Sequence, residues 1–140
     1  MNRKTVAPTP KVQISWGELI DRITILEIKL QRLDSEAASE NVRRELLSLD
    51  SIACQLLSER PDLESLKQQL KLVNQALWEI EDKIRAKEAA KSFNQEFIEL
   101  ARSVYMNNDK RGELKRQINA LLNSELVEEK QYTSYSATDL

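Results

Sequence analysis

Histidine is absent from this chain, and cysteine occurs once among the 140 residues, at Cys54. Ser-His-Asp and Cys-His catalysis both need a histidine base, so the composition excludes them. A structural zinc site, which draws four ligands mainly from Cys and His, is excluded on the same ground. One cysteine cannot form an internal disulfide, which fits a reducing cytoplasm, and we interpret Cys54 as a small residue on a helix flank. Any bound metal would be a hard ion on carboxylates, such as magnesium or manganese.

Glycine, proline and aromatic residues are also scarce: the chain has 2 Gly, 3 Pro and 5% aromatics. All-β folds need many glycine and proline turns, so this scarcity argues against them. Charged residues make up 31% of the chain and hydrophobic residues 41%, a mixture that is typical of long amphipathic helices. The composition therefore predicts an all-α protein.

Long apolar runs and charge blocks are missing as well. The net charge is −2, with acids and bases interspersed. This distribution indicates neither a nucleic-acid footprint nor a basic membrane patch, and no run of apolar residues is long enough to span a bilayer. The first eleven residues carry charge but no apolar signal-peptide core. We therefore expect a cytoplasmic protein that binds neither membranes nor nucleic acids.

Apolar residues instead recur in steps of three and four along four segments, at about residues 15–33, 42–59, 61–91 and 94–122. The longest uninterrupted seam is in the third segment and consists of Leu63, Leu66, Leu70, Val73, Leu77, Ile80 and Ile84. Residues 34–41 lose this pattern; a turn is the simpler interpretation, and a stutter in a continuous helix is the alternative. The pattern predicts antiparallel helical hairpins that form a four-helix bundle or an elongated coiled-coil-like bundle.

Helix start signals support these boundaries. Ser15 and Glu18 have the spacing of a capping box, and Pro61 suits the first turn of a helix. Ser92 and Asn94 compete as the cap of the last helix. The expected domain organisation is a flexible arm at 1–13, one helical domain at 14–123 and a polar tail at 124–140.

Polar residues gather in three groups on these helices. The first is Glu18, Asp21 and Arg22; the second is Asn74, Trp78, Glu81, Asp82 and Arg85; the third is Tyr105, Asn107, Asn108, Asp109 and Arg111. Antiparallel packing about a turn near residue 93 places residue 82 level with residue 104. We therefore expect the second and third groups to meet.

Two interpretations of these groups stay open. In the first, they form salt bridges and hydrogen bonds within the bundle, of which i,i+4 pairs such as Glu81–Arg85 contribute about 0.2–0.5 kcal/mol each. In the second, they line a ligand site between helices. Glu18 with Asp21, and Glu79 with Asp82, have the i,i+3 spacing with which facing helices bind a divalent cation. All-α nucleoside-triphosphate pyrophosphohydrolases use acid clusters of this general kind, but their E-E-x-x-E run is missing here. Arg85 and Arg111 would suit a phosphate or carboxylate.

The run S-W-G-E-L-I-D-R-I-T-I-L-E-I-K at residues 15–29 resembles a family of small uncharacterised bacterial proteins that is known only as a domain of unknown function. The resemblance continues through residues 77–85, 97–111, 114–119 and 124–130. A second uncharacterised family is similar over L-W-x-x-E-D-x-x-R and N-D-x-R. Members of the first family occur alone or beside tetratricopeptide repeats and sugar-transfer genes. The resemblance implies no activity, and it emphasises the residues that periodicity groups: Ser15, Gly17, Glu18, Asp21, Trp78, Glu81, Asp82, Arg85, Asn108, Asp109 and Arg111.

We expect a protein–protein interaction or assembly module rather than an enzyme, with no cofactor. It would form a homodimer, and the alternative partner is another protein. The long seam of the third helix and the missing catalytic bases motivate this hypothesis. The alternative is a protein that binds a phosphorylated or nucleotide-sugar ligand, or a metal-dependent phosphate-ester or pyrophosphate hydrolase that uses magnesium or manganese. Its candidate ligand-binding residues are Glu18, Asp21, Arg22, Asn74, Trp78, Glu81, Asp82, Arg85, Asn108, Asp109 and Arg111, and its candidate metal ligands are Glu18, Asp21, Glu79 and Asp82.

Overall fold

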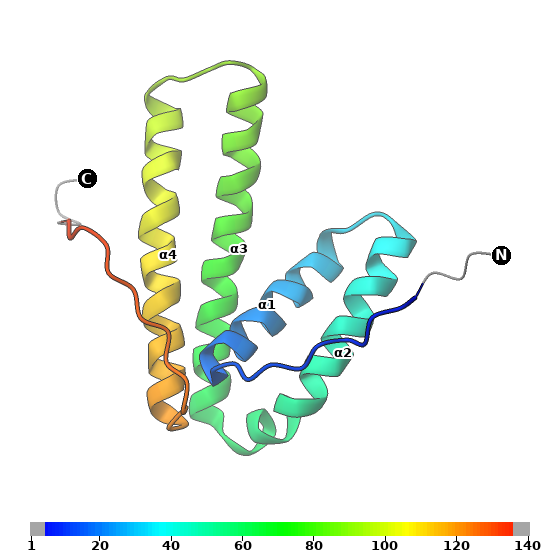
Figure 1. Ribbon diagram of the computed structural model, residues 1–140. Helices are drawn as coiled ribbons and strands as arrows, with labels where there is room; N and C mark the ends of the chain where they lie inside the picture. Colours follow the sequence, from blue (N-terminus) through cyan, green and yellow to red (C-terminus); the bar gives the residue numbers. More distant parts are fainter. Residues whose placement is uncertain (1–4, 136–140) are drawn as a thin grey trace.

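Two antiparallel helical hairpins make up the structure, a computed structural model that describes residues 5–135 (Figure 1). The first hairpin pairs α1 (Trp16–Arg32) with α2 (Glu36–Glu59), and the second pairs α3 (Pro61–Ala89) with α4 (Gln95–Leu121). The described residues contain no strand. The predicted all-α fold with four packed helices is confirmed.

Helix ends follow the predicted local signals. The Ser15 side chain accepts a hydrogen bond from the Glu18 N–H at 3.1 Å and caps α1. Pro61 occupies the first turn of α3. Asn94, rather than Ser92, caps α4 by accepting a hydrogen bond from the Phe97 N–H at 3.1 Å. Each cap satisfies a backbone donor that has no partner within its helix.

The connection between α1 and α2 is a turn, and it is shorter than predicted. Ser35 caps α2 and Glu36 already lies in its first turn, so residues 36–41 are helical. The prediction that residues 34–41 form a turn is therefore wrong for most of that range. This end of α2 is largely exposed, and local contacts rather than an apolar seam support it: the Ser35 cap and the pairs of Glu40 with Arg43 and Arg44.

The core lies where α1 packs against all three other helices. Its fully buried side chains come mainly from α1, from the first half of α3 and from the second half of α4, and α2 adds Ala53; they include Ile20, Ile23, Leu63, Leu70 and Ile118. The α1–α2 hairpin thus covers only one end of the α3–α4 hairpin (Figure 1). Cys54 is exposed on α2, outside this core, as expected.

The other end of the α3–α4 hairpin projects beyond α1 and α2 (Figure 1). We call residues 77–108 the distal hairpin. Its seam residues, Leu77, Ile80, Ile84, Leu100 and Val104, are only half-buried, although they continue the heptad pattern of the buried Leu63 and Leu70. Two helices alone shield one side of each other, so the same pattern buries less area here than beneath α1.

After α4 the chain turns back and runs alongside that helix (Figure 1). Ser124 accepts a hydrogen bond from the Trp16 N–H at 3.3 Å, which ties this segment to the start of α1. Residues 1–4 of the predicted arm and residues 136–140 of the predicted tail lie outside the described residues. None of the described helices is long and apolar enough to cross a bilayer.

Candidate functional site

One stripe of α3 begins where α1 covers that helix and contains four of the five residues of the second predicted group, all except Asp82. Its positions, in steps of four and three, are Lys67, Lys71, Asn74, Trp78, Glu81, Arg85 and Glu88. The first two lie near Glu27 of α1, with Nζ–Oε distances of 3.5 Å from Lys67 and 3.8 Å from Lys71. Asn74 contacts α1 one turn further along. We call these seven positions the α3 stripe.

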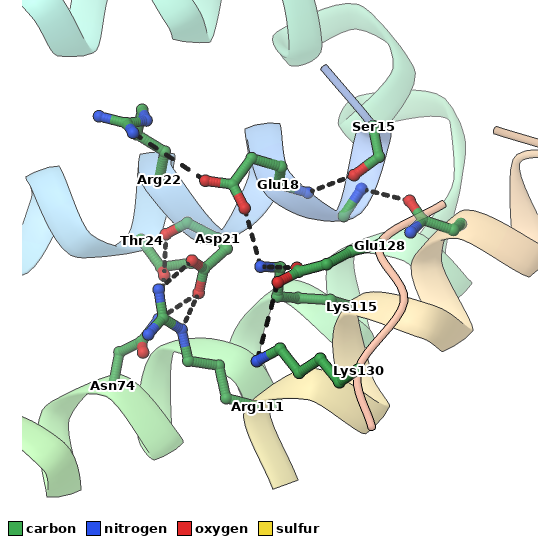
Figure 2. A network of polar contacts seen from close by, with 12 residues as sticks. Ser15, Glu18, Asp21, Arg22, Thr24, Asn74, Arg111, Lys115, Glu128 and Lys130 are labelled. Carbon is green, nitrogen blue, oxygen red and sulfur yellow. Dashed lines mark hydrogen bonds and ion pairs between the residues drawn. The ribbon is translucent and has the colours of Figure 1, made fainter. Parts of the chain in front are cut away.

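Asp21 forms the centre of a buried polar cluster (Figure 2). The Arg111 guanidinium of α4 donates to both carboxylate oxygens of Asp21, from Nε at 2.9 Å and from an Nη at 2.5 Å. Asn74 Nδ2 lies 2.9 Å from Asp21 Oδ1 and 2.9 Å from Thr24 Oγ1. Three helices, α1, α3 and α4, thus meet at one carboxylate.

Burial makes this pair electrostatically strong. The Asp21 side chain is only 1% exposed, and that of Arg111 is 29% exposed. The hydrogen bonds to Asp21 raise the pKa of Arg111 above its ordinary value, although burial acts in the opposite direction. Arg111 is charged, and the pair links α1 of the first hairpin to α4 of the second.

Lys115 forms a second ionic cluster one turn further along α4. Its Nζ lies 2.8 Å from Glu18 of α1 and 2.7 Å from Glu128 of the C-terminal segment (Figure 2). Burial lowers the pKa of Lys115, but the hydrogen bonds to Glu128 and Glu18 outweigh burial and raise it overall. The same bond from Lys115 lowers the pKa of Glu128.

At Gly17, α1 and α4 approach each other closely. A Cβ built on Gly17 would lie 2.5 Å from the backbone oxygen of Lys115 and 3.0 Å from Asn119 Oδ1. The Gly17 N–H donates to that same Oδ1 at 2.7 Å. Glycine is therefore required here for space, which explains a poor helix former in the first turn of α1.

Beyond the Asp21–Arg111 pair lies an open pocket of about 370 Å³ between α1 and α3. Its apolar wall consists of Ile25 and Ile28 with Leu77 and Trp78. The remaining lining residues are polar: Asn74, Glu81, Asp82, Arg85 and Arg111. All five predicted residues of α3 thus line one pocket, and Arg111 of α4 joins them.

The other predicted residues of α4 lie elsewhere. Asn108 and Asp109 line a separate groove with Tyr105 and the C-terminal segment, where Tyr135 donates to Asp109 at 2.5 Å. That bond raises the pKa of Tyr135 to about 12. Asn107 donates to the Ser103 carbonyl at 2.8 Å within its own helix. The predicted meeting of the second and third groups therefore occurs only through Arg111.

The predicted metal ligands mostly contact cations of the chain itself. Glu18 pairs with Lys115, Asp21 with Arg111, and Glu79 with Arg32 at 2.5 Å. Asp82 lines the pocket and makes no ion pair with another described residue. Between residues 5 and 135, no three His, Cys, Asp or Glu side chains gather in a way that would bind a metal ion.

Arg22 is exposed at the surface between α1 and α2, 3.6 Å from Glu45 and 4.0 Å from Glu18. Arg32 reaches Trp78 in addition to Glu79, with its guanidinium 5.7 Å from the centre of the ring. These contacts tie the end of α1 to the pocket wall. Arg22 itself takes no part in the pocket.

Sequence reasoning missed four residues of the polar clusters: Thr24, Lys115, Asn119 and Glu128. Lys115 and Asn119 follow Arg111 in steps of four along α4, so helical spacing alone would have placed them on the same side. Thr24 follows Asp21 by three residues on α1. Glu128 carried no such signal, because it lies in a segment without helical periodicity.

The Glu128–Lys115 contact predicts a pH-dependent attachment of the C-terminal segment. Replacing Glu128 with glutamine should speed amide hydrogen exchange in residues 122–135, while costing about 1 kcal/mol of global stability or less, because Glu128 is 45% exposed. The folded pKa of Glu128 lies below the ordinary 4.5, so its contribution is full above pH 4.5 and is lost as the pH falls through the folded pKa.

The matched control is Glu129→Gln, an exposed neighbour whose replacement should leave exchange unchanged. Exchange of peptides from 122–135 should also accelerate in the wild type at low pH, beyond the intrinsic pH effect. Equal exchange in the two variants would contradict the proposed role of Glu128.

Fold and site together define an all-α protein of two helical hairpins joined by buried ionic clusters. The chain belongs to the family of unknown function DUF6165, whose family model matches residues 10–139. This match confirms the resemblance to a domain of unknown function. Neither a curated protein nor a solved structure matches the chain.

Proposed function

We propose that this protein is an interaction module that self-associates as a homodimer through its distal hairpin. One observation carries the proposal: the face of the α3–α4 hairpin that α1 covers at one end continues uncovered at the other end. On α3, Lys67, Lys71 and Asn74 contact α1. Trp78 contacts Arg32 at the end of α1, and the stripe continues through Glu81 and Arg85 as exposed positions.

A matching stripe follows α4. Its positions, in steps of four and three, are Phe97, Ala101, Val104, Asn108, Arg111 and Lys115. The last two contact α1 through Asp21 and Glu18. The first three are apolar; Ala101 is exposed, and Phe97 and Val104 are half-buried, Phe97 against Phe93 and Val104 in the groove beside the C-terminal segment. A helix pair with partly exposed apolar residues of this kind is typical of a helix–helix interface.

A second copy of the chain suits this face because each copy presents the same face to the other. Two distal hairpins packed face to face form a four-helix bundle, in which each covers the other as α1 and α2 cover the opposite end. The seam residues of both hairpins would then become fully buried. Heptad spacing on both helices supports such packing.

The small-molecule alternative has less support from the pocket. Arg111, the deeper of its two arginines, already uses two donors on Asp21. The remaining charges on the rim are Glu81, Asp82 and Arg85, which together favour no anion. Binding of a phosphorylated or nucleotide-sugar ligand therefore stays a prediction.

The proposal predicts a mass of about 32 kDa in solution, twice the 16.2 kDa of the chain. Replacing Ala101 with glutamate should give a folded monomer, because the change places a charge on the uncovered stripe of α4 while the residue is exposed in one copy. Light scattering coupled to size exclusion measures both masses.

Ala120→Glu is the matched control, since it makes the same substitution at an exposed position near the end of the same helix. It should leave the dimer intact. A wild-type protein that remains at the monomer mass, or two variants that dissociate equally, would contradict the proposal.

A further inference from the structure

The uncovered part of the α3 stripe has a symmetric spacing. Its four positions are Trp78, Glu81, Arg85 and Glu88, separated by steps of three, four and three. Reversing the direction of the helix leaves these steps unchanged. An identical stripe running antiparallel therefore matches it position by position about a point level with residue 83.

The charges on the stripe are complementary under that reversal. The reversal places Glu81 of each copy opposite Arg85 of the other copy, so an acid faces a base at two points in the dimer. Within one copy the two side chains are held loosely, at 3.6 Å, with Glu81 48% and Arg85 79% exposed. Both are free to reorient toward a partner, since an exposed i,i+4 pair contributes little.

The positions along α4 are consistent with an antiparallel pairing of the two α3 helices about residue 83. The turn between α3 and α4 centres near residue 92, which places Ala101 level with residue 83. Ala101 is the smallest residue of the α4 stripe, and it would lie next to the two-fold axis. A small residue there allows the two hairpins to approach closely.

From these observations we infer that two copies pair with α3 antiparallel to α3 about a two-fold axis level with residue 83, and that Glu81 of each copy binds Arg85 of the other. This inference rests on the proposed function and adds the register and the recognition chemistry of the partner. Trp78 then lies opposite Glu88 and its neighbour Ala89, and the end of the second α3 covers the open pocket. The indole supplies the apolar anchor and the two ion pairs set the register.

Charge reversal at the two positions tests the register with variants that fold normally, because both side chains are exposed in the single copy. Glu81→Arg leaves only basic groups at the two positions, and Arg85→Glu leaves only acidic groups. Each variant alone should lose dimerisation, with the dissociation constant rising at least tenfold, because like charges face each other. An equimolar mixture should form a heterodimer, since every opposed pair is again acid against base.

Sedimentation velocity of the two variants, their mixture and the double variant E81R/R85E measures the outcome, and circular dichroism verifies folding. The double variant should dimerise by itself, because it restores opposite charges in the reversed sense. Recovery in both the mixture and the double variant supports the inference. A wild-type dimer whose single variants still dimerise, or whose mixture does not associate, overturns the register and leaves the homodimer standing. A monomeric wild type overturns both.

Discussion

Replacing Gly17 with alanine should lower the free energy of unfolding by about 2 kcal/mol, although alanine is the better helix former. The added Cβ would lie 2.5 Å from the Lys115 backbone oxygen, so α1 must move away from α4. That movement lengthens the bond from the Gly17 N–H to Asn119, which is now 2.7 Å long. Overpacking costs about 1–3 kcal/mol and a lost hydrogen bond about 0.5–1.5 kcal/mol, and together they exceed the gain of about 1 kcal/mol in helix propensity.

Gly112→Ala is the matched control, because it makes the same substitution at the chain's second glycine. A Cβ at Gly112 meets only Lys130 Nζ, at 3.8 Å. This position lies inside α4, so alanine should stabilise the protein by about 0.5–1 kcal/mol. Urea unfolding at one fixed protein concentration compares the two variants. Equal effects of the same sign would contradict the close approach at Gly17.

Replacing Asp21 with asparagine should destabilise the protein by about 3–5 kcal/mol, the cost of leaving one partner of a buried ion pair without its counter-charge. Asparagine keeps the size of the side chain, so the loss reports charge rather than a cavity. The Arg111 guanidinium would face an amide, and Asn74 would lose an anionic acceptor. The matched control is Glu113→Gln, whose pair with Arg116 is 2.7 Å long but half-exposed, and whose loss should cost at most about 1 kcal/mol.

A double-mutant cycle separates the pair from its surroundings. Arg111→Met removes the second charge, and the combined Asp21→Asn and Arg111→Met variant should lose less than the two single variants added together. The physical reason is that the charge left unpaired in either single variant is absent from the double variant. Additive losses would show that Asp21 and Arg111 stabilise the fold independently of each other.

The proposed homodimer gives the clusters and the pocket distinct roles. The Asp21–Arg111 and Lys115–Glu18 pairs hold the α1–α2 hairpin against one end of the α3–α4 hairpin. The uncovered Trp78 side of α3 is the face that we propose for the second copy. Variants of Asp21 should therefore weaken self-association only as far as they unfold the protein, whereas variants of Arg85 should weaken it without unfolding.

Helical spacing predicted much of the candidate site. Asn74, Trp78, Glu81, Asp82 and Arg85 share one face of one helix whatever that helix packs against, and the structure places all five on one pocket. Asp109 lies near Arg111 in sequence, but a helix turns by about 100° per residue, so these two side chains point in different directions. Asn108 is on the same side of α4 as Arg111 but one turn closer to the distal end, and both Asn108 and Asp109 line the groove beside the C-terminal segment.

Composition and local chemistry by themselves determined the all-α class, four helical segments and most helix ends, because turn residues, caps and apolar steps act over a few residues. The role of Gly17, the burial of Asp21 and the attachment of Glu128 depended on helices that are distant in sequence, since about 100 residues separate Gly17 from Asn119. The half-burial of Leu77, Ile80 and Ile84 could not be predicted from the sequence either, because their spacing is the same as that of Leu63 and Leu70. Only the tertiary structure decides how far along α3 the cover by α1 extends and where the uncovered face begins.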